Sequence, residues 1–337
     1  MVESPERHEE QREEQREEQS GSQRGGHAGE RRDALLAQLG ELSTEQVGDE
    51  QLQLDLMSVA ELVDTMNRAN ETVPAVVAAA APAITRAIDG IVERMQRGGR
   101  LIYVGAGTAG RMGVLAASEI PPTFGTDPTL VVGVIAGGAD AIGSAVENAE
   151  DNVGAAVADL TVLSLTADDA LVGISASGRT PYVRSALAYG RSLGAFTVAH
   201  ACNTNSEIGQ VAEVAIETAV GPEFLTGSTR LGSGTAQKLV VNMISTIVMV
   251  RLGKVYGSLM VDLKATNEKL RARSQRTVML ASGVDGATAA RALAEVDGWV
   301  KAAIVVAVTG LSGPDAIQLL SEHGGMLRAA LAAAVVE

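Results

Sequence analysis

Short apolar runs, separated by longer helical patterns, occupy the middle of the chain. Five of them have the length and composition of buried strands: Leu101 to Val104, Leu130 to Ile135, Ala170 to Ile174, Phe196 to Ala199 and Val214 to Glu217. Strands that are apolar along their whole length and alternate with helices are typical of a parallel sheet covered on both faces. We therefore expect an α/β fold, doubly wound around a mainly parallel five-stranded sheet.

The N-terminal part of the chain has a different pattern. Residues 1–32 contain a Glu-Glu-Gln-Arg repeat and almost no apolar residue, which predicts a disordered charged tail. A transient helix held by Glu and Arg pairs is the alternative. Residues 33–72 are expected to form amphipathic helices, because apolar residues recur there at helical spacing: Leu35, Leu36 and Leu39, then Leu56, Val59, Leu62 and Met66.

The C-terminal part is expected to be helical. Three short helices are predicted, at Ala287 to Val300, Pro314 to His323 and Met326 to Val336, whereas Ala302 to Val308 is ambiguous between strand and helix. The chain then divides into a tail (1–32), an N-terminal helical segment (33–72), an α/β domain (73–270) and a small helical C-terminal unit (271–337).

Composition narrows the possible partners. The 337 residues carry a net charge of -14 and only 2% aromatic residues, which argues against binding to nucleic acid or to an anionic membrane. An anionic ligand must therefore be held by local groups. The lone Cys202 cannot form an internal disulfide, no apolar run is long enough to span a membrane, and the first residues lack a secretion signal. We expect a cytoplasmic protein.

Two loops between a strand and a helix have the composition of anion sites. The first, Gly105 to Gly110, matches the Gly-x-Gly-x-x-Gly fingerprint. A dinucleotide site also needs an acidic residue after the next strand, where Ala136-Gly137-Gly138 stands instead. The second loop, Ser175 to Thr180, gathers hydroxyls, amides and the Arg179 guanidinium, which suit a phosphate monoester. Capping of the following helix by Ser and Thr is the alternative.

A third polar loop, Gly227 to Arg230, leads into a long helix that carries Gln237, Lys238 and Asn242. Three Gly, Ser and Thr loops at helix entrances in one domain are unusual as turns alone. Together they favour a small phosphorylated ligand beyond the carboxyl ends of the strands.

Two glutamates fall among apolar helical positions. The helix after the first loop is expected to run from about Gly110 to Glu119 and to stop before Pro121-Pro122. Glu119 would share a face with apolar residues at the helix C-terminus. Burial and the helix dipole would then disfavour its charge, as a general acid requires.

Glu150 falls within the core stripe of a helix expected from about Ala141 to Leu160. At about 100° per residue, that stripe contains Ile142, Val146, Ala149, Val153, Val157 and Leu160. A glutamate in a core stripe needs a partner or a function. A buried ion pair with an Arg or Lys is the alternative to catalysis.

From about Leu42 to the C-terminus, the sequence closely resembles the N-acetylmuramic acid 6-phosphate etherases, members of the sugar isomerase (SIS) fold group. The segments that carry the resemblance are Tyr103 to Thr108, Ala117 to Glu119 with Pro121 to Thr123, Val146 to Asp151, Ala176 to Val183, Gly234 to Lys238 and Ala265 to Leu270. The resemblance implies an SIS-type sheet and a homodimer with its site near the subunit interface. It implies no metal or redox cofactor.

The implied reaction removes a D-lactyl ether by elimination and then hydration, giving N-acetylglucosamine 6-phosphate and D-lactate. By the same likeness, Glu119 protonates the leaving lactate and then activates the water, and Glu150 is the base at C2. The residues implied to hold phosphate and sugar are Gly107, Thr108, Ser177, Gly178, Arg179, Thr180, Ser228 and Lys238. Which residue opens the sugar ring is left open.

The chain departs from the family pattern at four positions, where family members have Ser, Asp, Cys and Lys. Here these positions are Ala109, Ala116, Ile120 and Gly232, in the same order. A missing hydroxyl at position 109 removes a possible phosphate or sugar contact. Two rivals have the same architecture: a sugar-phosphate-sensing regulator, like the glucokinase regulatory protein, and an aldose-ketose phosphate isomerase. Release of D-lactate distinguishes the etherase from both.

Overall fold

The computed structural model describes residues 40, 42–48, 53–263, 265 and 267–334. The predicted charged tail and the first predicted helix, with Leu35, Leu36 and Leu39, lie outside the described residues.

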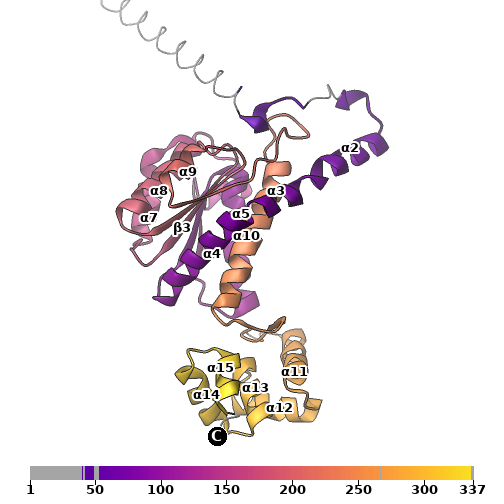
Figure 1. Ribbon diagram of the computed structural model, residues 1–337, viewed down its shortest axis with the longest axis vertical. Helices are drawn as coiled ribbons and strands as arrows, with labels where there is room; N and C mark the ends of the chain where they lie inside the picture. Colours follow the sequence, from indigo (N-terminus) through magenta and orange to yellow (C-terminus); the bar gives the residue numbers. More distant parts are fainter. Residues whose placement is uncertain (1–39, 41, 49–52, 264, 266, 335–337) are drawn as a thin grey trace, which may run out of the picture.

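A five-stranded parallel sheet forms the centre of the α/β part of the molecule, which lies above the helical C-terminal part in Figure 1. Its strand order is β2-β1-β3-β4-β5, and β1 lies in register between two neighbours, with Leu101 opposite both Val131 and Ala170. The predicted fold class is confirmed. The strands are β1 (Leu101–Gly105), β2 (Val131–Ile135), β3 (Ala170–Ser175), β4 (Phe196–Ala201) and β5 (Val214–Glu217).

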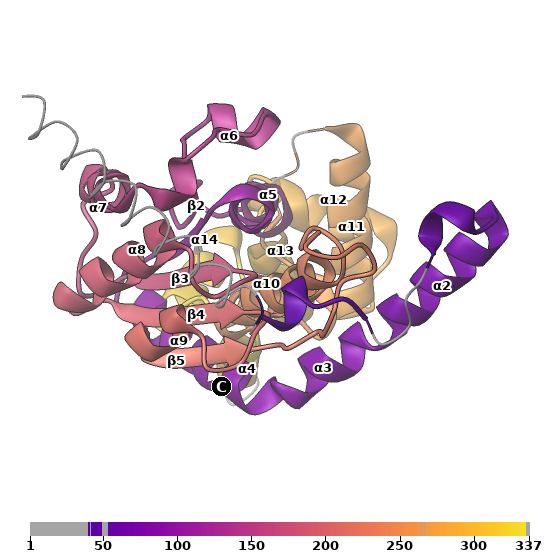
Figure 2. The same ribbon diagram turned by 90° about the horizontal axis from the view of Figure 1, so that it is seen from above.

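Helices cover both faces of the sheet because successive strand residues point to opposite sides. Leu101 and Tyr103 pack toward helices α3, α4, α5 and α10, whereas Ile102 and Val104 pack toward α7, α8 and α9 (Figure 2). The helices of the first layer are α3 (Val73–Ala79), α4 (Ala81–Gln96), α5 (Gly107–Phe124) and α10 (Gly232–Arg251). Those of the second are α7 (Val153–Val162), α8 (Pro181–Ser192) and α9 (Glu207–Val211).

Helix α5 does not end before the two prolines as predicted. It includes Pro121 and Pro122 and ends only at Gly125, which adopts the left-handed conformation with φ 63°. Ile120 and Phe124 are both buried in the core next to the prolines. We attribute the continuation of the helix to this packing, which outweighs the local cost of proline.

The helix predicted from Ala141 to Leu160 is broken into three pieces. These are α6 (Asp140–Gly143), a 3-10 turn η3 (Ala149–Asp151) and α7. Asn148 takes a left-handed conformation with φ 58°, and the Asn152 side chain accepts the amide of Ala155 at 3.0 Å, so that α7 starts afresh. The prediction of one continuous helix with a buried apolar face is therefore wrong. Ile142, Val146 and Val153, which were assigned to that face, are exposed.

The segment before the sheet forms two 3-10 turns and a projecting helix. The turns are η1 (Ser43–Glu45) and η2 (Leu54–Leu56), and the helix is α2 (Val59–Glu71). Ser58 and Glu61 close a capping box at the start of α2. No residue of α2 is buried, and the helix extends away from the sheet in both views (Figures 1 and 2).

The C-terminal part is helical, as predicted. Val300–Thr309, which includes the ambiguous segment, is helix α13, and it lies within a separate apolar core. The other helices are α11 (Glu268–Ser282), α12 (Gly286–Glu295), α14 (Gly313–Glu322) and α15 (Leu327–Ala334). A small hairpin of β6 (Val255–Tyr256) and β7 (Leu259–Met260), which the sequence analysis did not predict, precedes them. The predicted domain boundaries stay predictions.

Among the described residues, no single helix has the length and apolar composition of a membrane span. Two bent helix pairs, Val59–Ala79 with Ala81–Gln96 and Val300–Thr309 with Gly313–Glu322, pass that test only in combination.

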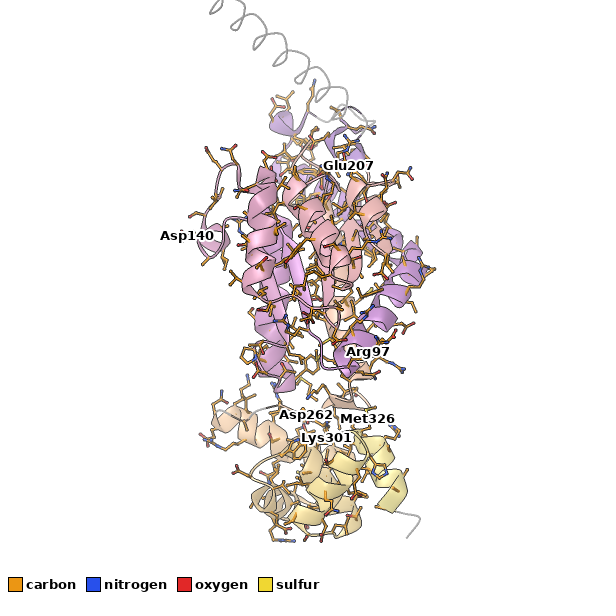
Figure 3. All side chains as sticks on the ribbon, turned by 90° about the vertical axis from the view of Figure 1, so that its left-hand side faces the viewer. Arg97, Asp140, Glu207, Asp262, Lys301 and Met326 are labelled. Atoms are coloured by element: carbon orange, nitrogen blue, oxygen red, sulfur yellow. The ribbon has the colours of Figure 1, made fainter. Side chains whose placement is uncertain are left out.

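A buried carboxylate joins the helical C-terminal part to the end of α10. Asp262 accepts hydrogen bonds from Lys301 Nζ at 2.8 Å and from Trp299 Nε1 at 3.0 Å, and Lys254 Nζ lies 3.1 Å away. Figure 3 shows Asp262 and Lys301 at the junction of the two parts. Burial alone raises the pKa of Asp262, but the Lys301 hydrogen bond and charge, with Trp299 and Lys254, bring it below its ordinary value.

Replacement of this carboxylate, Asp262→Ala, should lower the free energy of unfolding by about 3–5 kcal/mol at neutral pH, because it leaves the Lys301 ammonium buried without its partner. The native pKa of Asp262 is depressed, so its contribution is complete above the unfolded-state pKa of about 4 and is lost as the pH falls through the native value. Denaturant unfolding from pH 7 to pH 3 measures this. Asp297→Asn, at an exposed position nearby, is the matched control. An equal loss at all pH values would contradict the assignment.

Candidate active site

The three polar loops meet at the carboxyl edge of the sheet. Strands β1 and β3 are neighbours, so the loops that follow them lie side by side. Gly234, at the start of α10, connects the first and third loops: a Cβ atom there would lie 3.6 Å from Thr108 Cγ2 and 3.5 Å from the Thr229 carbonyl oxygen. The predicted convergence of the loops is therefore present in the fold.

The loop after β3 is organised by a cluster of hydroxyl groups. The buried Ser175 hydroxyl lies 2.8 Å from Thr180 Oγ1 and 3.3 Å from Ser177 Oγ, and it accepts the amide of Gly178 at 3.0 Å. Gly178 has φ 74°, and a Cβ atom on it would lie 2.5 Å from Ser206 Cβ. Only glycine fits this position, both in conformation and in space.

The N-terminus of α8 is open to a ligand. Thr180 is its N-cap residue but makes no capping hydrogen bond through its side chain, and Pro181 occupies the first turn. The alternative in which Thr180 caps the helix is therefore absent from the structure. The hydroxyls of Ser175 and Ser177 instead accept the loop amides of Gly178 and Arg179. A helix N-terminus of this kind favours an anion.

The N-terminus of α5 is also uncapped. Its N-cap residue is Ala106, which has no polar side chain, and Gly107 and Thr108 form the first turn. The flanking glycines are explained by packing, since a Cβ atom on Gly110 would lie 2.8 Å from the Gly105 carbonyl oxygen. The glycine fingerprint thus serves close contact between helix and strand, which leaves the amides of the turn for an anion.

The N-terminus of α10 is occupied by the protein itself. The Glu223 carboxylate, on a residue that is 5% exposed, accepts the amides of Gly232 at 2.7 Å and Ser233 at 2.9 Å. Ser228 lies in the turn before this helix, where its amide donates to the Leu225 carbonyl. Of the three helix entrances, those of α5 and α8 remain open to a phosphate.

Glu150 is exposed, contrary to the prediction. It lies in η3 and lines a cleft of about 190 Å³ together with Gly107 and Arg111. Its side chain makes no hydrogen bond or ion pair with another described residue, so the alternative of a buried ion pair is not realised. Glu150 and the first glycine loop therefore face one cleft.

Glu119 is also exposed, with 58% of its side chain accessible, and the predicted burial is wrong here too. Ala116 and Ile120 of α5 are buried, whereas Glu119 faces outward. Its carboxylate lies 3.4 Å from Lys238 Nζ of α10. Glu119 and Lys238, both predicted site residues, therefore face each other. Glu119 borders a different cleft from that of Glu150, of about 400 Å³, between α5, α10 and the β6-β7 hairpin.

The two glutamates lie toward opposite ends of α5. Gly107 is the first residue of the helix and Glu119 stands twelve positions later, about 18 Å along the axis at 1.5 Å per residue. This separation is longer than one hexose phosphate. Within one chain, the structure brings Glu150 to the glycine loop and Glu119 to Lys238, but it does not bring the two pairs together.

Three of the four family departures, Ala109, Ala116 and Ile120, are buried. Ala109 and Ala116 are 6% and 3% exposed, on the face of α5 that packs into the core. Ala109 therefore points away from the open turn of α5.

His200 and Cys202 do not offer an alternative catalytic pair. His200 Nε2 lies 3.0 Å from Thr218 Oγ1, and burial lowers the pKa of His200 to about 4. Burial raises the pKa of Cys202 to about 11. At neutral pH both side chains are uncharged, and both are enclosed.

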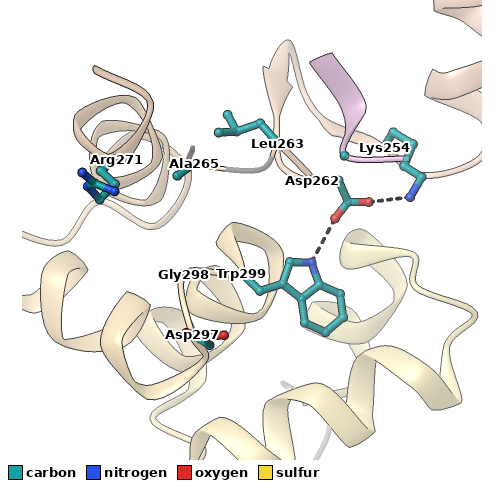
Figure 4. A pocket seen from close by; sticks show the side chains of 9 residues that line it. Lys254, Asp262, Leu263, Ala265, Arg271, Asp297, Gly298 and Trp299 are labelled. Atoms are coloured by element: carbon teal, nitrogen blue, oxygen red, sulfur yellow. Dashed lines mark hydrogen bonds and ion pairs between the residues drawn. The ribbon is translucent and has the colours of Figure 1, made fainter. Parts of the chain in front are cut away.

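The largest of the clefts described here lies elsewhere, between the sheet domain and the helical C-terminal part (Figure 4). It encloses about 610 Å³ and is lined by Lys254, Asp262, Arg271 and Trp299, among others. None of the predicted site residues lines it. Its polar groups include the Asp262 cluster, which has a structural role.

Asn203, which follows β4, belongs to this edge of the sheet although no sequence pattern predicted it. Its side-chain amide donates to the Ala176 carbonyl at 3.1 Å and to Thr44 Oγ1 at 3.3 Å, and its carbonyl oxygen accepts from Ser43. The N-terminal segment is thereby fastened beside the loop after β3. A contact between residues 160 positions apart has no local signal in the sequence.

The chain is similar in sequence to one family model and to many known proteins. The glucokinase regulatory protein N-terminal SIS domain model matches residues 83–191. The N-acetylmuramic acid 6-phosphate etherase of Streptomyces coelicolor is 57% identical over 272 residues, which cover 81% of this chain and 88% of that protein. The protein of the same name from Caldanaerobacter subterraneus subsp. tengcongensis is 52% identical over 270 residues, or 80% and 88% of the two chains.

Among solved structures, a phosphoheptose isomerase from Francisella tularensis matches with a TM-score of 0.46 and 17% identity, covering 57% of this chain and 98% of that one. The sequence relatives carry the assignment, because they match more than half of the aligned residues over four-fifths of the chain. The chain belongs to the N-acetylmuramic acid 6-phosphate etherase family.

Proposed function

We propose that this protein cleaves the D-lactyl ether of N-acetylmuramic acid 6-phosphate by elimination and hydration, giving N-acetylglucosamine 6-phosphate and D-lactate. The observation that carries the proposal is the 57% identity to a protein of that name, which extends through the loops at the sheet edge. Two uncapped helix N-termini at that edge suit the phosphate of such a substrate.

The phosphate is proposed to bind between the first turns of α5 and α8. Gly107 and Thr108 supply one turn, and Ser177 to Thr180 supply the other, with the Arg179 guanidinium as the charged donor. Three phosphate oxygens need several donors, and backbone amides provide them without adding net charge. This explains how a chain with a net charge of -14 holds an anion.

The proton transfers are assigned to Glu150 and Glu119. In the open-chain aldehyde the C2 proton lies next to a carbonyl, and Glu150 removes it. The C3–O bond then breaks, and its electron pair goes to the lactate oxygen, which takes a proton from Glu119. Water, deprotonated by Glu119, adds to C3, and the proton returns to C2. Two carboxyl groups with opposite protonation needs suffice for this sequence.

Lys238 is proposed to bind the carboxylate of the lactyl group. In the ligand-free protein its ammonium lies 3.4 Å from the Glu119 carboxylate. A lactyl carboxylate would compete with Glu119 for this ammonium, and an ammonium bound to the substrate would place the lactyl group beside Glu119.

We infer that the working enzyme is a homodimer in which Glu119 serves the partner's site. Within one chain Glu119 is too far from the glycine loop. Around it, α5 and α10 expose a row of apolar residues that suits a subunit interface: Leu115, Met243, Ile247 and Val250. A two-fold axis there would carry each Glu119 toward the partner's Glu150 cleft.

A cytoplasmic location is part of the proposal. Its basis is the lone Cys202, which is buried and cannot form an internal disulfide.

Glu119→Gln should abolish D-lactate release, because it removes the acid for the leaving group, and it should leave exchange of the C2 proton with solvent. Glu150→Gln should abolish both. Coupled D-lactate assay and proton NMR in deuterated water measure the two steps, and Glu147→Gln, at an exposed neighbouring position, is the control. Wild-type protein that releases no D-lactate while binding fructose phosphates would favour the regulator instead.

Mixed dimers test whether the site is shared between subunits. When Glu119→Gln and Glu150→Gln chains are refolded or co-expressed together, about half of the dimers should be mixed, each with one intact site, so about a quarter of wild-type activity should return. Two differently tagged Glu119→Gln chains are the control. Purified mixed dimers without activity would show that each chain uses its own pair.

A further inference from the structure

The segment Leu42–Gln46, named here the strap, is built into the carboxyl edge of the sheet. Leu42 and Thr44 are buried. The Ser43 amide and hydroxyl both donate to Asn203 Oδ1 at 2.9 Å, and Asn203 in turn donates to the Ala176 carbonyl at 3.1 Å. Since Ala176 precedes Ser177, the strap is fastened to the loop that is proposed to bind phosphate.

The strap also contacts the third polar loop. The Gly227 amide donates to the Thr44 carbonyl at 3.2 Å. Glu45 Oε2 lies 2.9 Å from the position that a Cβ atom on Gly227 would occupy, so glycine makes room for this carboxylate. The third loop reaches Thr108 through Gly234. Glu45 is therefore held among the polar loops at the carboxyl edge of the sheet, where the sugar phosphate is proposed to bind.

Glu45 is half-buried, and its carboxylate makes no hydrogen bond or ion pair with another described residue. A carboxylate held beside polar loops without a partner is suited to accept protons from a ligand. Its position is fixed through its neighbours Ser43 and Thr44, so the lack of a partner does not reflect a loose segment.

We propose that Glu45 opens the pyranose ring of the substrate. This step rests on the proposed function, because the C2 proton becomes acidic only next to a free aldehyde, and Glu150 and Glu119 are assigned to C2 and C3. Glu45 takes the proton of the C1 hydroxyl. The C1–O5 bond breaks, its electron pair goes to O5, and the carboxyl of Glu45 returns the proton to O5. Glu45 ends the step as it began, and C1 becomes the aldehyde.

Glu45→Gln should lower kcat/KM for D-lactate release by about 100-fold or more, the usual effect of removing a general base. Ring opening then limits the rate. The primary isotope effect of a substrate deuterated at C2 should therefore fall toward unity, and added formate should restore part of the rate in Glu45→Ala. Glu45→Asp, which keeps a carboxylate, should retain more activity. Gln46→Ala, an exposed neighbour on the strap, is the control.

The outcomes separate this inference from the proposed function. If the wild-type enzyme releases no D-lactate, the proposed function fails first. If it does, and Glu45→Gln loses activity with its isotope effect intact and no rescue by formate, then Glu45 only positions the loops. Unchanged activity in Glu45→Gln also overturns the inference. Binding of N-acetylglucosamine 6-phosphate by calorimetry verifies that each variant is folded and holds phosphate.

Discussion

The contact between helix α5 and strand β1 fixes both parts of the candidate site. Gly105 and Gly110 let the two backbones approach so closely that a Cβ atom on either would collide with the other, and Gly113 packs on Tyr103 in the same way. The first turn of α5 is thereby placed at the carboxyl edge, where its amides are open to an anion. The same rigid helix carries Glu119 away toward Lys238. One packing constraint thus sets both the position of the candidate anion site and its distance from the proposed acid.

Capping determines which helix entrances are open to an anion. The three helices that follow the polar loops, α5, α8 and α10, present free amides in principle, but the Glu223 carboxylate already accepts hydrogen bonds from those of α10. The entrances of α5 and α8 lack a side-chain cap. In an acidic protein, the attraction for an anion is therefore greatest at the N-termini of α5 and α8. The hydrogen bonds of Glu223 and Asn203 hold the surrounding loops in position.

The sequence predicted those parts of the fold that depend on local patterns. All five strands were found, because a strand buried on both faces is apolar throughout. The helix predicted around Glu150 was wrong. Its apolar residues have the spacing of a buried helix face, but Asn148 interrupts the helix with a left-handed conformation and Asn152 caps the start of α7. Burial of Ile120 and Phe124 likewise carried α5 through two prolines. The strap was missed since its contacts join residues about 160 positions apart.

The exposure of both glutamates sharpens the case for a shared site. A general acid is effective when its surroundings exclude water and support its protonated form. Within one chain neither Glu119 nor Glu150 has such surroundings. A partner subunit that packs on the apolar row of α5 and α10 would cover Glu119 and bring it to the cleft beside Gly107. Periodicity within one sequence placed Glu119 on the correct helix, but it placed Glu150 in a helix that is a 3-10 turn, and it predicted burial of both within their own chain. In the proposed dimer, a second chain supplies the surroundings that both glutamates need.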